Sequence, residues 1–175
     1  MEFSDYLLSI RACEDARSWC GNKTLSEAWN TCERGDWLLW LAAKHMDKPG
    51  WPTRKQIVLA ACACAETAQK FANDNGVSAN TLKIVRLWAN GEATIEQVRE
   101  ARRAAAAAAA DADAYAYAYA YAAADADADA AAAYAAAYAA AADDADDAAA
   151  AARNKSRLET AQIVRSMLTI PASHE

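Results

Sequence analysis

A long low-complexity tract of alanine, aspartate and tyrosine limits the folds that this chain can adopt. Of the 52 residues from 101 to 152, 35 are alanine, whereas the whole chain of 175 residues contains 51 alanines. Alanine is the strongest helix former and is depleted in β-strands. Tyr134 and Tyr138 are four residues apart, a spacing that places two side chains on one face of a helix. We therefore predict that the tract is helical.

The tract is too long to form one helix within a domain of this size. Fifty residues at about 1.5 Å per residue would extend roughly 75 Å. We therefore expect a helical hairpin with a break near residues 122–125 or 143–147. Two alternatives stay open. The Tyr-Ala and Asp-Ala alternations have the period of a β-strand, and single-base codon differences could have produced the repeat by replication drift, without any function.

The first hundred residues are rich in tryptophan and carry the start and stop signals of several helices. A stripe that includes Leu8, Ala12 and Trp19 predicts one helix over residues 4–20, and Gly21 is placed to end it. Further boundaries follow from capping signals. We expect capping boxes at Thr24 with Glu27 and Thr94 with Gln97, a stop at Gly35, an N-cap at Asp36, a start at Pro52 or Thr53, a stop at Asn75 and Gly76, an N-cap at Ser78 or Asn80, and a stop at Gly91.

Residues 57–65 are nine consecutive apolar residues bounded by polar ones. Such a run leaves no helix face for water, so we predict that its helix is the central and most buried one. Cys62 and Cys64 are two residues apart and therefore point about 200° apart on a helix. They cannot both face one metal ion, and we interpret them as small buried hydrophobic residues.

A final amphipathic helix is predicted from the spacing of Leu158, Ala161, Val164 and Leu168. The expected fold is an all-α bundle of about seven or eight helices with a long alanine-rich helical hairpin. We expect one domain over residues 1–175, made of a tryptophan-rich helical half (1–100), the alanine-rich tract (101–152) and a C-terminal helix (153–170).

The charge of the chain is distributed unevenly. The net charge is −6, yet residues 104–152 contain nine aspartates and no cation, so the rest of the chain carries +3. An acidic segment disfavours direct binding to nucleic acid or to an anionic membrane and favours a basic protein partner. The residues that we predict to bind such a partner are Asp143, Asp144, Asp146, Asp147, Tyr134 and Tyr138.

The sequence offers little catalytic chemistry. His45 is the only histidine within the helical pattern, in the last turn of its helix, where a structural role is typical. The five glycines are isolated and the cysteines lack metal-ligand spacing. We therefore expect no enzymatic activity, no cofactor and no metal. An odd number of cysteines in apolar helical patterns, with neither a signal peptide nor a membrane-spanning run, predicts a soluble cytoplasmic protein.

All six tryptophans lie among the first 88 residues. Core packing is their usual role, but Asp36, Trp37 and Trp40 could also line a small-ligand pocket or a partner patch. This composition supports an alternative function, a small-ligand binding module that uses the alanine hairpin as a dimerisation surface.

Three strings in this order resemble one known family: CERGDWLLWLA (32–42), VLAACACAE (58–66) and LWANGEATIEQVR (87–99). They are followed by the Ala/Asp/Tyr tract and a short RxKxRxxxAxIVR ending. Together they resemble the alanine-rich immunity proteins of bacterial polymorphic-toxin systems over about residues 8–168. The resemblance implies an all-helical cytoplasmic protein that protects a cell by binding a toxin domain. This chain departs from the family pattern because its tract lacks interspersed arginine, and a related alternative is a phage-borne anti-defence inhibitor that acts as a partial DNA mimic.

Overall fold

The computed structural model describes residues 2–69, 76–109 and 147–173, and every regular element in these ranges is an α-helix. The predicted all-α class is therefore confirmed for the described chain. None of these helices is both long and apolar enough to cross a membrane. The described helices are α1 (Phe3–Ser9), α2 (Glu14–Cys20), α3 (Leu25–Thr31), α4 (Gly35–Lys44), α5 (Arg54–Gln69), α6 (Val77–Asn90), α7 (Ile95–Ala109) and α10 (Asp147–Met167).

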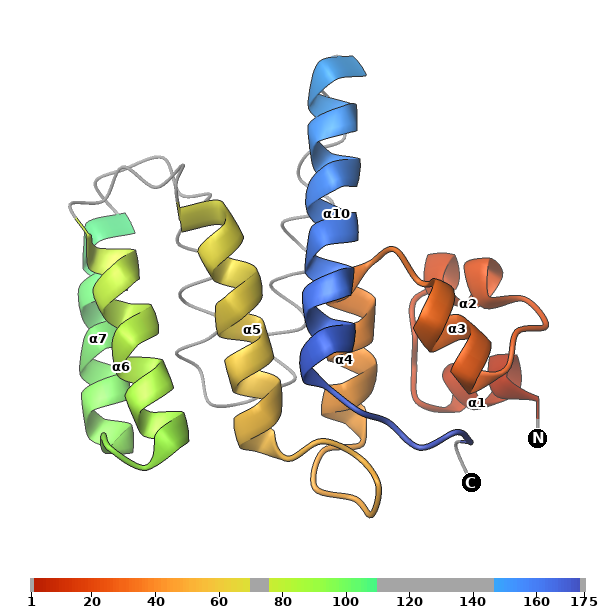
Figure 1. The fold of residues 1–175 in the computed structure, drawn as a ribbon, viewed down its shortest axis with the longest axis horizontal. Helices are drawn as coiled ribbons and strands as arrows, with labels where there is room; N and C mark the ends of the chain where they lie inside the picture. Colours follow the sequence, from red (N-terminus) through yellow and green to blue (C-terminus); the bar gives the residue numbers. More distant parts are fainter. Residues whose placement is uncertain (1, 70–75, 110–146, 174–175) are drawn as a thin grey trace.

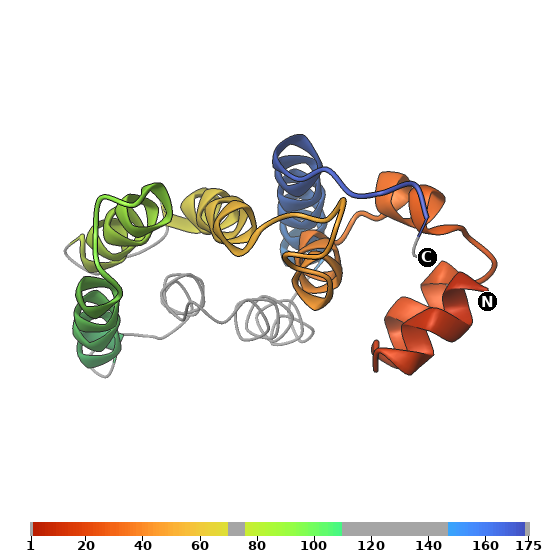
Figure 2. The ribbon, with the colours of Figure 1, turned by 90° about the horizontal axis from the view of Figure 1, so that it is seen from below.

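The described helices are arranged as an elongated row (Figure 1). Helices α7 and α6 stand at one end, followed by α5 and then by α4 with α10, and the short helices α1 to α3 lie at the other end. Figure 2 shows the same order from below. Helix α5 packs against α4, α6 and α10, while α7 packs against α6. Helix α5 therefore connects the two halves of the row.

Helix α5 contributes two different faces to two hydrophobic cores. Ile57 and Cys64 belong to the core shared with α1 to α4 and α10, whereas Val58, Cys62 and Ala65 belong to the core shared with α6 and α7. Burial on two faces explains why the sequence of this helix shows no polar stripe. The prediction of a central helix is confirmed, and the two cysteines point into separate cores, as their spacing predicts.

The predicted capping boxes are present. The backbone N–H of Thr24 donates to Glu27 Oε2 at 2.8 Å, and the N–H of Glu27 donates to Thr24 Oγ1 at 3.2 Å. Thr94 and Gln97 make the corresponding pair of hydrogen bonds at 2.8 and 3.3 Å. Thr53 opens α5 in the same manner. These starts are set by residues three positions apart, so the local sequence is sufficient to predict them.

The prediction of one helix over residues 4–20 is wrong, because the chain reverses between α1 and α2. Arg11 adopts a left-handed backbone with φ of +63°. The N–H groups of Arg11 and Ala12 donate back to carbonyls in the last turns of α1, at 3.0 and 2.9 Å. This is the hydrogen-bond pattern of a Schellman motif, in which the left-handed position is usually a glycine. Leu8, which the predicted stripe would bury, is 57% exposed.

The predicted roles of Gly35 and Asp36 are also wrong. Helix α3 ends at Thr31, whereas Gly35 is the first residue of α4 and Arg34 occupies the N-cap position. A Cβ atom at Gly35 would lie 2.6 to 2.8 Å from atoms of Thr160 in α10. The glycine therefore permits close contact between two helices and does not stop the preceding one.

Two glycine stops are confirmed and one helix start is not. Gly21 follows α2 and Gly91 follows α6, both with positive φ. Helix α6 begins one residue after Gly76, which occupies the N-cap position. Ser78 and Asn80, the predicted caps, lie inside this helix, where Ser78 is buried.

Both ends of the alanine-rich tract are helical. Helix α7 continues to Ala109, and α10 begins at Asp147, six residues before the predicted start of the C-terminal helix, and ends at Met167. The described ends of the tract therefore agree with the helical prediction. The predicted hairpin and its first break site, residues 122–125, lie outside the described residues. Figure 1 shows α10 running alongside α4.

Candidate functional site

A hollow of about 360 Å³ lies between the three short helices and α4. The predicted pocket residues Asp36, Trp37 and Trp40 all line it. The opposite side is formed by residues of α1 to α3, among them Phe3 and Trp19. Its size is within the usual range of small-molecule pockets, which are mostly apolar with a few polar groups.

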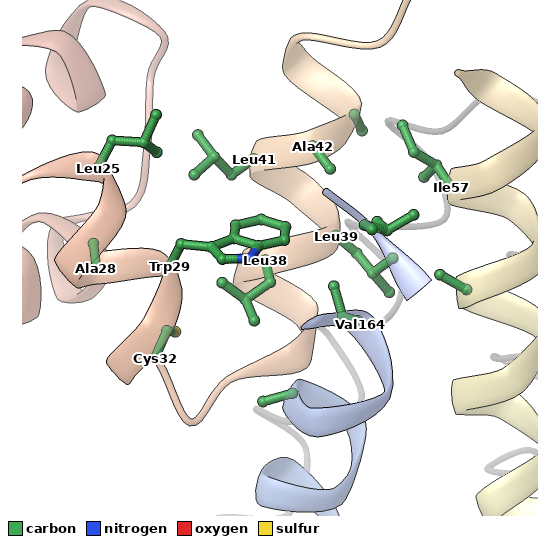
Figure 3. Packing of buried hydrophobic residues seen from close by; sticks show 14 of the residues in the cluster. Leu25, Ala28, Trp29, Cys32, Leu38, Leu39, Leu41, Ala42, Ile57 and Val164 are labelled. Carbon is green, nitrogen blue, oxygen red and sulfur yellow. The ribbon is translucent and has the colours of Figure 1, made fainter. Parts of the chain in front are cut away.

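The pocket depends on how α4 presents its side chains. Figure 3 shows the indole of Trp29 reaching from α3 to Leu38 on α4, while Leu39 lies toward Val164 of α10. The Trp29 side chain is almost wholly buried, at 6% exposure. One side of α4 therefore builds the core with α10, and the other side forms a wall of the pocket.

The aromatic walls contact one another across the pocket. The ring centroids of Trp19 on α2 and Trp37 on α4 are 6.0 Å apart, and the ring planes are inclined by 60°. This is the tilted arrangement that aromatic pairs favour. Trp37 and Trp40 are partly buried, so both can pack on the core and still offer ring surface to the pocket.

The carboxylate of Asp36 is held in an internal ion pair. Arg34 Nε donates to Asp36 Oδ1 at 2.9 Å and Arg34 Nη2 donates to Oδ2 at 2.5 Å, while the Asp36 side chain is only 5% exposed. The hydrogen bond to Asp36 is the main cause that raises the pKa of Arg34. The Arg34 guanidinium also lies 4.6 Å from the centre of the Trp37 ring. Asp36 therefore reaches the pocket as a neutralised pair and not as a free charge.

Two lysines lie over Trp19 and Trp40. Lys23 Nζ is 4.6 Å from the centre of the Trp19 ring and donates to the Trp19 carbonyl oxygen at 2.8 Å. Lys44 Nζ is 5.6 Å from the centre of the Trp40 ring. Cations at these distances interact favourably with indole rings. Three of the four pocket tryptophans therefore have a cation over the ring.

Arg11 adds a further cation to the lining. Its side chain is exposed, and within the described chain no hydrogen bond or ion pair engages its guanidinium. The left-handed backbone between α1 and α2 places this residue at the pocket. Sequence reasoning missed Arg11, because its position depends on a chain reversal that no glycine or proline marks.

Three of the five cysteines also line the pocket. Burial raises the pKa of the Cys20 thiol and raises that of Cys32 to about 11. Both thiols are therefore protonated at neutral pH and poor nucleophiles. Cys13 differs from the other four cysteines because it is exposed.

His45 connects α4 to α1. Its Nδ1 lies 2.9 Å from the Leu41 carbonyl oxygen, and its Nε2 is hydrogen-bonded to the Tyr6 hydroxyl. Because a carbonyl only accepts, Nδ1 carries the proton and Nε2 accepts from Tyr6. The His45 ring, 3% exposed, also stacks on Trp51 with a centroid distance of 3.9 Å. These contacts agree with the predicted structural role of His45, although its partners Tyr6 and Trp51 were not predictable from sequence.

The predicted partner-binding residues are not part of this pocket. Five of them, Tyr134, Tyr138, Asp143, Asp144 and Asp146, lie outside the described residues. Asp147 is the first residue of α10. The structure therefore does not place the predicted acidic surface relative to the pocket.

The described residues contain no group of three or more His, Cys, Asp or Glu side chains that could hold a metal ion. Burial raises the pKa of both Cys62 and Cys64 to about 12, which is unfavourable for the thiolate form that binds metals. No protein-family model matches the chain, and neither a curated protein nor a solved structure is significantly similar to it.

Proposed function

We propose that this protein is an immunity-type inhibitor, which neutralises a toxin or nuclease domain in the cytoplasm by binding it through an acidic helical surface. The observation that carries the proposal is the segment 104–152, with nine aspartates and no cation. Its described ends, in α7 and α10, are helical. A helical hairpin between them would present these carboxylates on a rigid element.

Charge complementarity supports a basic partner. Toxin domains that act on nucleic acid carry basic clefts, and an acidic surface can occupy such a cleft and raise the association rate. The resemblance to alanine-rich immunity proteins favours the same interpretation. Its three strings correspond to α4, to α5 and to the junction of α6 with α7, so the strings describe the scaffold that would carry the acidic surface.

The test is co-expression with a toxin domain encoded beside the gene, followed by growth measurement and co-purification. Wild-type protein should restore growth and form a stable complex. Replacing four aspartates by asparagine should weaken the complex and make its affinity less dependent on salt concentration. The replaced residues are Asp143, Asp144, Asp146 and Asp147. The matched control replaces four exposed glutamates of the described chain by glutamine: Glu33, Glu92, Glu100 and Glu159.

Both variants change the net charge by the same amount. Equal binding by the two variants would refute the assignment of the acidic cluster as the binding surface. Absence of any complex with wild-type protein would refute the proposed neutralisation of that toxin.

A second candidate function is small-ligand binding, and the tryptophan-lined pocket is the observation that favours it. A ligand of suitable size would contact Trp19, Trp37 and Trp40 at once. Its binding should therefore change the intrinsic tryptophan fluorescence. Titration with a metabolite panel tests this function, and a flat fluorescence response would count against it.

A further inference from the structure

We infer that the pocket between α1–α3 and α4 takes a small monocarboxylate with an apolar chain or ring, and that Arg11 binds its carboxylate. The inference rests on the second candidate function, ligand binding in this pocket, and adds the chemical class of the ligand. It is independent of toxin binding by the acidic segment.

The walls select the apolar part of the ligand. Aromatic rings enter the pocket from α1, α2, α3 and α4, including Phe3, Trp19 and Trp37. The remaining lining is mostly alanine, leucine and cysteine. Burying a hydrocarbon chain or ring against such walls is favourable at about 25 cal/mol per Å² of apolar surface. A strongly polar ligand would leave its hydrogen-bonding groups unsatisfied there.

The charges around the pocket select the acidic part. The one carboxylate in the lining, Asp36, is already bound by both nitrogens of the Arg34 fork. Arg11 lines the same pocket and has no ion-pair partner in the described chain. Lys23 adds a second cation above Trp19. The pocket therefore presents more positive than negative charge, which is complementary to a carboxylate and repels an ammonium.

The backbone at Arg11 supports the same assignment. At the left-handed position of a Schellman motif, a residue with a Cβ atom is strained relative to glycine. The ends of α2 and α6, at Gly21 and Gly91, have glycine at positive φ. At Arg11 the chain instead has a guanidinium at the rim of an apolar pocket. Backbone strain of this kind is concentrated at ligand sites.

The experiment uses three probes with straight chains of nearly equal length and different head groups: decanoate, decanol and decyltrimethylammonium. Each is titrated below its micellar concentration into the full chain, and tryptophan fluorescence is recorded. We expect decanoate to bind about tenfold more tightly than decanol, the gain of one charge-assisted hydrogen bond. The ammonium should bind most weakly. Decanoate should also slow the modification of exposed Cys13 by a thiol reagent.

Substitutions at Arg11 separate charge from fold. Arg11→Gly suits the left-handed backbone, so it should keep or raise the melting temperature while it removes the guanidinium. Arg11→Asn, which also tolerates this backbone, is a second neutral variant. Both should bind decanoate and decanol equally, whereas Arg11→Lys should keep most of the preference for decanoate.

Three results would overturn the inference. Equal binding of decanoate and decanol to wild-type protein would refute the carboxylate class but leave the pocket as an apolar binding site. A preference for decanoate that survives in both neutral variants would refute the role of Arg11. No fluorescence change and no Cys13 protection with any probe would refute both this inference and the ligand-binding candidate, without bearing on toxin neutralisation.

Discussion

Gly35→Ala tests the contact between α4 and α10 most directly. The added methyl carbon would lie 2.6 Å from Thr160 Oγ1 and 2.7 Å from the Thr160 carbonyl carbon. Non-bonded carbon atoms prefer about 3.5–4.0 Å. Helix α10 would therefore have to move away from α4 by about 1 Å, because a backbone atom cannot rotate aside as a side chain can.

The expected cost follows from that geometry. Forcing an extra methyl into a packed core costs about 1–3 kcal/mol, and the backbone contact places this site at the upper end. The higher helix propensity of alanine offsets at most about 1 kcal/mol. We expect a net loss of about 2 kcal/mol in the free energy of unfolding, which lowers the melting temperature by about 4–8 °C for a chain of this length.

Thermal unfolding followed by circular dichroism measures this loss, and Gly91→Ala is the matched control. Gly91 has a φ of +85° and no atom within 4 Å of an added Cβ, so its substitution reports backbone strain without a clash. Adding Thr160→Ala to Gly35→Ala removes the hydroxyl contact but not the carbonyl contact, so it should recover only part of the loss. An unchanged melting temperature in Gly35→Ala, or full recovery in the double variant, would refute the close contact with the α10 backbone.

Three further predictions concern stability. Arg165→Met should lower the free energy of unfolding by about 1–3 kcal/mol, measured by urea unfolding. The reason is that Arg165 Nη1 donates to a carbonyl oxygen at the C-terminal end of α3 at 2.6 Å. Unchanged stability would show that the fold does not need this hydrogen bond. The free energy of unfolding should fall as pH rises from about 9 toward 12. Burial raises the pKa of Cys62 and Cys64 from 9.0 to about 12. In this pH range the unfolded chain therefore loses the two thiol protons before the folded chain does. The free energy of unfolding falls by up to about 1.4 kcal/mol per pH unit for each thiol. Replacing both cysteines by alanine should flatten this pH slope, and an unaltered slope would contradict the assignment. Tyr6→Phe removes the hydroxyl that donates to His45 Nε2 and should lower the free energy of unfolding by about 1–2 kcal/mol. The amides of α1 should also lose protection in hydrogen exchange. Protection equal to wild type would argue that this hydrogen bond does not hold α1 in place.

The features that sequence predicted correctly depend on residues close together in the chain. The capping box of Thr24 and Glu27 spans three positions, and the two-faced burial of α5 follows from nine consecutive apolar residues. The pocket residues Asp36, Trp37 and Trp40 lie within about one helical turn, which explains why their shared location could be predicted. Whether they bind a ligand depends on the residues opposite them.

The features that sequence missed depend on contacts between distant residues or on an unusual backbone. Gly35 has the same local signature whether it ends a helix or allows α10 to approach, and only Thr160 decides between these roles. Arg165 binds the end of α3 from 133 positions away in the chain. Arg11 occupies a left-handed position that sequence reasoning assigns to glycine. One chain reversal was therefore missed, and with it the wall of the pocket that α1 and α2 supply.

The string of residues 32–42 serves packing and pocket at the same time. It contains Gly35, which allows α10 to pack on α4, and it contains Asp36 and Trp37, which line the pocket. A substitution within this string therefore changes the core and the pocket together, and a loss of binding there would not identify its cause. Arg11 faces the same pocket from outside the string, and its neutral variants relieve backbone strain. Relief of backbone strain raises stability, whereas damage to the core lowers it. A gain in stability together with a loss of carboxylate preference can therefore only come from the missing guanidinium.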